Sequence, residues 1–173
     1  MALPARPRPR RHKRPRKRPS RSPRPSPAST QQRHTRAWER FNTVPSESAT
    51  HGQRYVNNYA NKIAAATYLQ YESVTAMPIG SVLAKHSSKI NISFKINKKG
   101  KAVAGPLFLM EKMPAGFNAE TRDWKYWAVM PNGNLMGVTG GEKSDKVKFC
   151  AACHNGMGVK TDAMTFLPKE YRN

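Results

Sequence analysis

Cysteine is scarce in this chain of 173 residues: Cys150 and Cys153, both in the stretch KFCAACHNG, are the only two. A framework of several disulfides is therefore excluded. Acidic residues are nearly missing from the first 40 positions, where 14 Lys and Arg stand against Glu39 alone. Long apolar runs are missing as well, and none approaches the roughly 18 residues that a membrane span requires. We therefore expect no membrane span.

Residues 1–45 form a basic, proline-rich arm. Its first 30 residues hold eight of the 14 prolines and little that could be buried, so we expect the arm to be disordered. Such a run could neutralise nucleic-acid phosphates or sit on an anionic membrane surface. No aromatic residue for base stacking precedes Trp38, which makes nucleic acid an unfavoured partner. An inert extension and a start-site artefact remain alternative interpretations.

Residues 46–173 have the composition of one globular domain. Thr50 to Gln53 has the spacing of a capping box, and apolar residues then recur every three or four positions, which predicts an amphipathic helix ending near Gln70. From Ile90 to Ile96 apolar and polar residues alternate, which predicts a strand with one face on a core.

Further short strands are predicted on both sides of this segment. They cover residues 81–86, the stretch around Val103, and residues 107–113, 124–130 and 135–138, with the turn PNGN joining the last two. We expect an α+β fold, with a mainly antiparallel sheet, one N-terminal amphipathic helix and a short C-terminal helical segment that carries the CxxCH motif.

The pair of thiols admits several uses. Cys150, Cys153 and His154 supply three of the four ligands of a structural zinc site, with His51 or His86 as a distant fourth, but adjacent side chains could hardly both reach one tetrahedral ion. A reactive dithiol of the thioredoxin type would need a βαβ unit, which the strand pattern does not supply. A plain disulfide is the structural alternative.

A covalently bound haem c uses all three residues. Cys-x-x-Cys-His is the attachment signature of this cofactor, in which each thiol bonds to one vinyl group and the histidine becomes the proximal iron ligand. Only 19 residues follow His154. Met157 is too close to reach the other face of the porphyrin and Met164 is an unfavoured ligand, so we expect an open distal position that binds small molecules.

Six stretches resemble the cytochrome P-460 family, in this order: HGQRYVNNYAN, PIGSVLAKHS, GPLFLMEKMPAGF, RDWKYWAVMPNG, VKFCAACH and FLPKEYR. The resemblance covers about residues 49–173. It implies a mainly antiparallel β fold, a five-coordinate haem c and a periplasmic location, although no apolar signal segment follows the basic run as an export signal requires. Founding members oxidise hydroxylamine and sometimes nitric oxide, while the cytochromes c-prime-beta bind nitric oxide and carbon monoxide.

The resemblance also implies a role for one lysine. Founding members carry a lysine bonded through its side-chain nitrogen to the porphyrin, in a strand of the pattern Gly-x-Val-x-x-Lys, and Gly80, Val82 and Lys85 match it. In a strand Lys85 would point to the same side as Leu83 and Ser81, which is inward if that face lines the haem pocket, and burial would favour the neutral amine that such a bond needs. Lys112 is the reserve candidate. The alternatives are a surface lysine and a lysine near the haem that never bonds to it.

The sequence offers several candidate residues for removing protons and for forming the distal wall. A carboxylate would be the natural base, with Glu111 as the candidate in a strand and Glu120 in a loop. Phe94, Phe108 and Met110 suit an apolar wall above the iron, although at strand spacing each also suits a simple core. Apolar crowding would favour gas binding, and a positioned acid would favour catalysis.

Two functions follow for the haem. The first is an oxidoreductase that oxidises hydroxylamine, or nitric oxide, and passes the electrons to a small redox acceptor such as another cytochrome. The second is reversible binding of nitric oxide or carbon monoxide without turnover. Self-association into a homodimer is kept open as a further interaction, and nucleic-acid binding through the arm is the third function considered.

Overall fold

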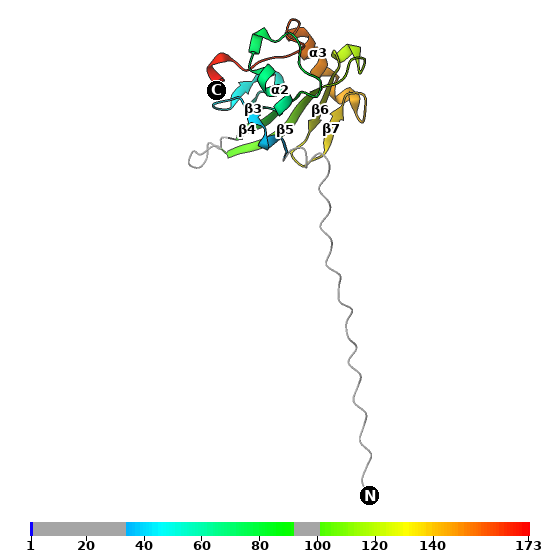
Figure 1. Ribbon diagram of the computed structural model, residues 1–173. Coiled ribbons are helices and arrows are strands. Elements are labelled where there is room, and N and C mark those ends of the chain that lie inside the picture. The colour runs from blue at the N-terminus through cyan, green and yellow to red at the C-terminus, as the bar shows by residue number, and fades with distance from the viewer. Residues whose placement is uncertain (2–33, 92–100) are drawn as a thin grey trace.

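The computed structural model describes Met1, residues 34–91 and residues 101–173, and within these ranges the chain forms one sheet of seven strands (Figure 1). The strands are β1 (Glu39–Arg40), β2 (Ser46–Ser48), β3 (Arg54–Ala60), β4 (Val82–Asn91), β5 (Lys101–Lys112), β6 (Trp124–Val129) and β7 (Leu135–Val138). The α-helices are α2 (Lys62–Tyr68) and α3 (Lys148–Met157). Short 3-10 helices are η1 (Thr35–Ala37), η2 (Ala49–His51), η3 (Tyr71–Ser73), η4 (Ala119–Thr121), η5 (Ser144–Val147) and η6 (Lys169–Tyr171).

All strand pairs in the described ranges are antiparallel, in the order β1-β3-β4-β5-β6-β7, with β2 also paired to β3. The hairpin of β6 and β7 has the predicted PNGN turn, in which the Gly133 N–H donates to the Met130 carbonyl at 2.8 Å. Gly133 has a φ of 85°, a left-handed conformation that favours glycine. The predicted hairpin and the mainly antiparallel sheet are confirmed.

The helix predicted to begin at Thr50 does not begin there. Ala49–His51 form only the short 3-10 helix η2. Gly52 and Gln53 follow with φ angles of 80° and 51°, and two left-handed residues in succession end a right-handed helix. The capping-box prediction is therefore wrong.

The next seven residues form the strand β3, and α2 begins only after it. Val56, Asn58 and Ala60 are buried while the residues between them are half-exposed, which is the alternation of a strand with one face on a core. Asn61 caps α2, because its side-chain oxygen accepts a hydrogen bond from the Ala64 N–H at 3.0 Å. The four-residue spacing of Val56 and Ala60 fits a helix and a strand equally, which is why periodicity predicted too long a helix.

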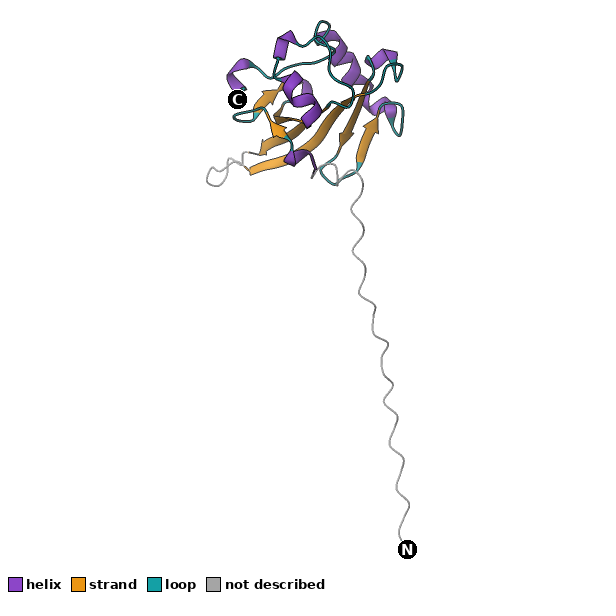
Figure 2. Ribbon diagram, in the orientation of Figure 1, coloured by secondary structure: helices purple, strands orange, loops and turns teal. Residues whose placement is uncertain are grey.

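The sheet has an apolar core on each face. The larger core packs against both α-helices, which lie on the same side of the sheet (Figure 2). Side chains that alternate with these along the strands point to the second core, formed by Ala84, Leu107, Leu109, Trp127 and Val129. The C-terminal helix is therefore held over one face of a sheet whose other face packs separately.

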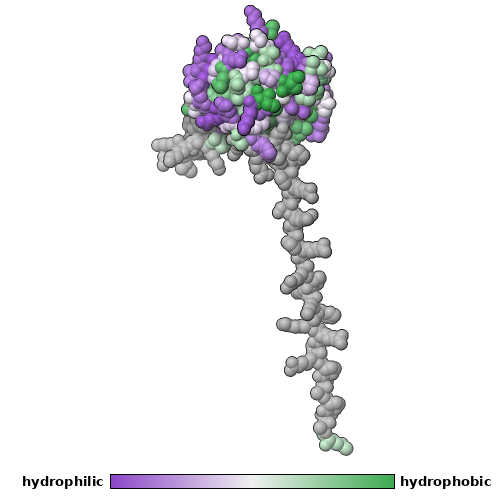
Figure 3. Space-filling view, in the orientation of Figure 1, coloured by the Kyte–Doolittle hydropathy of each residue, from purple (hydrophilic) through white to green (hydrophobic). Residues whose placement is uncertain are grey.

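The surface on the side shown in Figure 1 is mostly hydrophilic, with a few hydrophobic side chains near its middle (Figure 3). Among the helices of the described residues, none combines the length and the hydropathy needed to cross a bilayer.

Two predictions fall near the edges of the described ranges. The strand expected over residues 90–96 is represented by the end of β4, and residues 92–100, including Phe94, lie outside the described residues. On the N-terminal side, Phe41 is buried in the larger core and β1 pairs with β3. Residues 35–42 thus pack on the domain, although they fall within the predicted arm.

Candidate functional site

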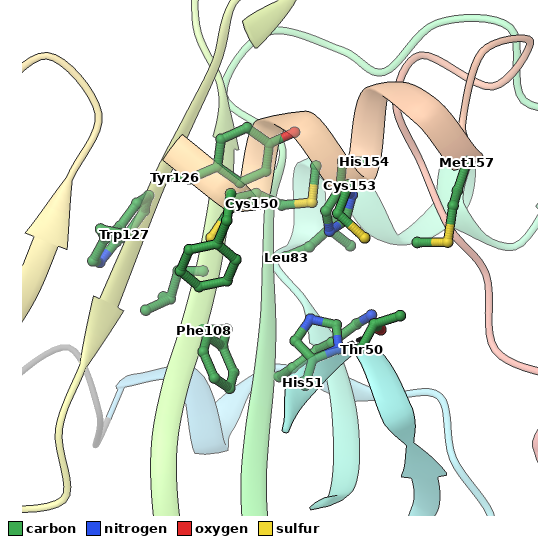
Figure 4. A pocket seen from close by; sticks show the side chains of 14 residues that line it. Thr50, His51, Leu83, Phe108, Tyr126, Trp127, Cys150, Cys153, His154 and Met157 are labelled. Atoms are coloured by element: carbon green, nitrogen blue, oxygen red, sulfur yellow. Dashed lines mark hydrogen bonds between the residues drawn. The ribbon is translucent and has the colours of Figure 1, made fainter. Parts of the chain in front are cut away.

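Four side chains of α3 point to the same side of that helix. Cys150, Cys153, His154 and Met157 are separated by three, one and three residues, so they share one helical face. All four line one cavity (Figure 4). Both thiols are half-buried and free, and His154 is buried. The helix α3 is therefore one wall of this cavity.

The cavity is partly open to solvent, and its walls enclose about 590 Å³ of space when the open part is included. Strands β4, β5 and β6 contribute the apolar side chains Leu83, Phe108, Met110 and Tyr126. Figure 4 shows His51, Thr50 and Phe108 on the side opposite Cys153 and His154. The site is an apolar cleft with a few polar groups on two facing walls.

His154 is held in one tautomer by its neighbour. Its Nδ1 lies 2.8 Å from the Ala163 carbonyl oxygen, which can only accept, so Nδ1 carries the proton and donates. Burial, followed by the charge of Lys85, lowers the pKa of His154 to about 4. The imidazole is therefore neutral at physiological pH, with the lone pair of Nε2 left for a metal.

His51 lies on the opposite wall. Its Nδ1 is 2.8 Å from Ser48 Oγ, and its ring meets the ring of Phe108 edge-on, with centroids 5.1 Å apart. Burial lowers the pKa of His51 to about 3, with further contributions from the charges of Lys85 and His154. His51 is therefore a neutral hydrogen-bonding group beside Phe108 in this wall.

Lys85 lines the same cavity from β4. It is paired in register with Asn58 on one side and with Phe108 on the other. Burial lowers the pKa of Lys85 to about 8, and the neighbouring Cys153 opposes this shift. A substantial fraction of the amine is therefore neutral near pH 8, which is the state that can form a bond.

The acidic candidates are not in the cavity. Glu111 forms an ion pair with Lys125 at 3.4 Å, and it lies on the face of β5 opposite to Phe108 and Met110. Glu120 is exposed and lies outside the cavity lining. The position of Glu111 therefore does not support its assignment as the proton acceptor, because strand alternation turns it away from the apolar wall.

Of the remaining predicted site residues, two line the cavity and one does not. Phe108 and Met110 line the cavity, whereas Lys112, the reserve lysine, binds Asp162 at 2.8 Å instead. Sequence reasoning missed His51 and Tyr126 as lining residues. The Tyr126 ring lies 5.4 Å from the ring of His154, and its hydroxyl is buried with no hydrogen-bond partner among the described residues.

The donor set fits a haem c better than the alternatives. Burial raises the pKa of the Cys150 thiol to about 11, which is opposite to the low value of a reactive dithiol. Within residues 34–91 and 101–173, no three His, Cys, Asp or Glu side chains converge as a metal cluster would require. Two free thiols beside a neutral imidazole, on the wall of an apolar cleft, match the groups that hold a covalent haem.

Comparison with known families gives one match. Residues 33–167 match the family model described as cytochrome P-460. No curated protein matches the chain.

Proposed function

The chain belongs to the cytochrome P-460 family, whose members bind a covalently attached haem c, and from this we propose that the protein oxidises hydroxylamine and passes the electrons to an external acceptor. One observation supports the proposal above others. The two thiols and the imidazole of the attachment motif line the same cavity as Lys85 and His51, and His51 lies on the wall that faces them. The site therefore offers a place for the haem and a polar group opposite its proximal ligand.

The attachment residues divide the task of holding the cofactor. Cys150 and Cys153 would hold the haem through two thioether bonds, and His154 would supply Nε2 to the iron. Bound haem c supplies an iron that takes a small ligand and accepts its electrons. Ala163 keeps the proton on Nδ1, so the imidazole meets the metal in its neutral form.

His51 orients the substrate on the open side. Since Nδ1 of His51 is engaged by Ser48, Nε2 is the nitrogen that faces a bound molecule. A hydrogen bond from hydroxylamine to Nε2 fixes the substrate against Phe108 and gives its proton a route to the Ser48 hydroxyl. The exposed Thr50, whose hydroxyl lies 3.3 Å from Nδ1, continues this route toward solvent.

Lys85 tunes the site from the strand β4. Its amine is held at a low pKa by burial, so it is available to bond the porphyrin edge as the lysine of founding members does. Removal of its charge, by bonding or by deprotonation, also relieves part of the depression of the pKa of His51. A bonded Lys85 would therefore make His51 a better proton acceptor.

Reversible binding of nitric oxide or carbon monoxide is the second candidate. It is favoured by Leu83, Phe108 and Met110, which crowd the cavity with apolar surface and leave no carboxylate among its lining residues. Such a wall admits small uncharged gases and offers little to remove protons.

The proposed setting follows from the cofactor. Family members are generally periplasmic or secreted, so we place the protein in the periplasm, with a small redox protein such as another cytochrome as the electron acceptor. A homodimer is a compatible assembly.

Turnover separates the two functions. Purified holoprotein should reduce a dye acceptor steadily when hydroxylamine is added, and E111Q should retain this activity because Glu111 lies outside the cavity. Spectral changes with nitric oxide or carbon monoxide but no hydroxylamine turnover would instead establish gas binding. A protein that carries no haem-sized mass addition on the CAACH peptide would contradict both.

A further inference from the structure

The loop after α3 turns back to meet its own helix. The Gly158 N–H donates to the His154 carbonyl at 2.8 Å, and the Ala163 N–H donates to the Gly158 carbonyl at 2.8 Å. This fold-back carries the Ala163 carbonyl to within 2.8 Å of His154 Nδ1. A methyl group at Gly158 would lie only 2.5 Å from the Ala163 carbonyl carbon, so the two segments are in close contact.

Two residues of this loop have an unfavourable backbone conformation. Asp162 and Ala163 have φ angles of 53° and 61°, in the left-handed region that residues other than glycine rarely adopt. Such a conformation persists only where the surroundings hold it. The position of the carbonyl that binds His154 therefore depends on whatever holds Asp162.

Asp162 is held at three atoms by three separate segments. Its Oδ1 accepts from Lys112 Nζ at 2.8 Å, and its Oδ2 accepts from the Met77 N–H at 2.9 Å. Its backbone carbonyl accepts from Trp124 Nε1 at 2.8 Å. The two side chains of the ion pair are only 15% and 10% exposed, so solvent screens their attraction little.

Lys112 is itself fixed. Besides Asp162 it donates to the Arg122 carbonyl at 2.9 Å, and it lies 5.4 Å from the centre of the Trp124 ring. It ends β5, the strand that carries Phe108 and Met110 in the cavity wall. A rigid sheet strand is thereby tied to the loop that touches the proximal histidine.

We propose that the Lys112–Asp162 ion pair is a positioning device that fixes the Ala163 carbonyl against His154 and thereby sets the strength of the bond from His154 to the iron. The inference rests on the proposed role of His154 as proximal ligand and does not depend on hydroxylamine turnover. A carbonyl held on Nδ1–H makes the imidazole a stronger donor, which strengthens the iron–histidine bond and favours the ferric state. Loss of the pair lets the loop relax and weakens that hydrogen bond.

The test uses holoprotein and the variant K112M. Resonance Raman spectra of the ferrous protein should show the iron–histidine stretching band at lower frequency than in the wild type. The ratio of ferrous to ferric protein at a fixed potential should rise about tenfold, the lower end of what outer-shell partners contribute to metal sites. Loss of a positive charge alone would favour the ferric state and move this ratio the other way. The direction of the change therefore separates positioning from simple electrostatics.

Two further variants control the result. K125M removes the cation of the Lys125–Glu111 pair, on the opposite face of the same sheet, and should leave the iron–histidine band unchanged. K112R keeps the charge and should restore most of the wild-type band position.

D162N serves if K112M does not accumulate as holoprotein. Its amide oxygen can still accept one of the two side-chain hydrogen bonds, so a smaller shift in the same direction is expected. Wild-type bands in the variants that load haem would overturn the inference. A wild type without an iron–histidine band would overturn the ligand assignment of the proposed function instead.

Discussion

Replacement of Lys85 by Met should stabilise the protein at neutral pH and remove part of the pH dependence of its stability. Burial lowers the pKa of Lys85 from 10.5 to about 8. At 1.36 kcal/mol per pKa unit, this shift corresponds to about 3 kcal/mol of destabilisation while the amine is charged in both states. The folded chain binds fewer protons than the unfolded chain between pH 8 and 10.5, so the free energy of unfolding rises with pH across that window. The free energy of unfolding of K85M should not show this rise with pH.

Denaturant titrations between pH 7 and 11 measure the difference. The gap between K85M and wild type should be up to about 3 kcal/mol at pH 7 and should close as the pH passes 10. K89M, which changes an exposed lysine of the same strand, should follow the wild type. Mass spectrometry must first show that Lys85 of the wild type is unmodified. Parallel curves of unfolding free energy against pH for K85M and this wild type would then refute the reasoning. A link between Lys85 and the CAACH peptide would show that the amine is bonded to the haem.

Three other changes test different parts of the molecule. C150S and C153S should each retain haem through one thioether, while the double variant should release it on denaturation; intact mass measured under denaturing conditions checks this. H51L should lower hydroxylamine turnover by about 10²-fold and leave carbon monoxide binding intact in optical titrations, and unchanged turnover would remove His51 from the proposed route. N61A should lower the free energy of unfolding by about 2 kcal/mol, because it loses the cap of α2 and side-chain hydrogen bonds to Gly80 and Val82; a loss below about 0.5 kcal/mol in denaturant titration would contradict this.

Local sequence patterns were sufficient to predict the structure where a single local interaction determines the backbone conformation. The PNGN turn predicted the β6–β7 hairpin because Gly133 adopts the left-handed conformation that the turn requires. The alternation that directs Lys85 and Leu83 to one face likewise holds in β4, and both side chains line the cavity. Period-two alternation is a property of the strand alone, so the sequence carries it.

The same rule could have predicted that Glu111 faces away from the cavity. If Phe108 and Met110 face the cavity, then the residue after Met110 faces away, and Glu111 pairs with Lys125 on that other face. By contrast, no local pattern could place His51, which is 103 positions before His154 and meets the site only through the pairing of β3 with β4. The fold-back of Asp162 and Ala163 could not be predicted from local sequence either, because three segments distant in the sequence hold it.

The second apolar core contains no residue of α3 and none of the attachment motif among its described members. The sheet can therefore keep one face packed before any haem is attached, and the strands that carry Lys85 and Phe108 are supported from behind in the apoprotein. The strand residues that line the cavity would then need little rearrangement when the haem binds, so less conformational entropy would be lost on attachment.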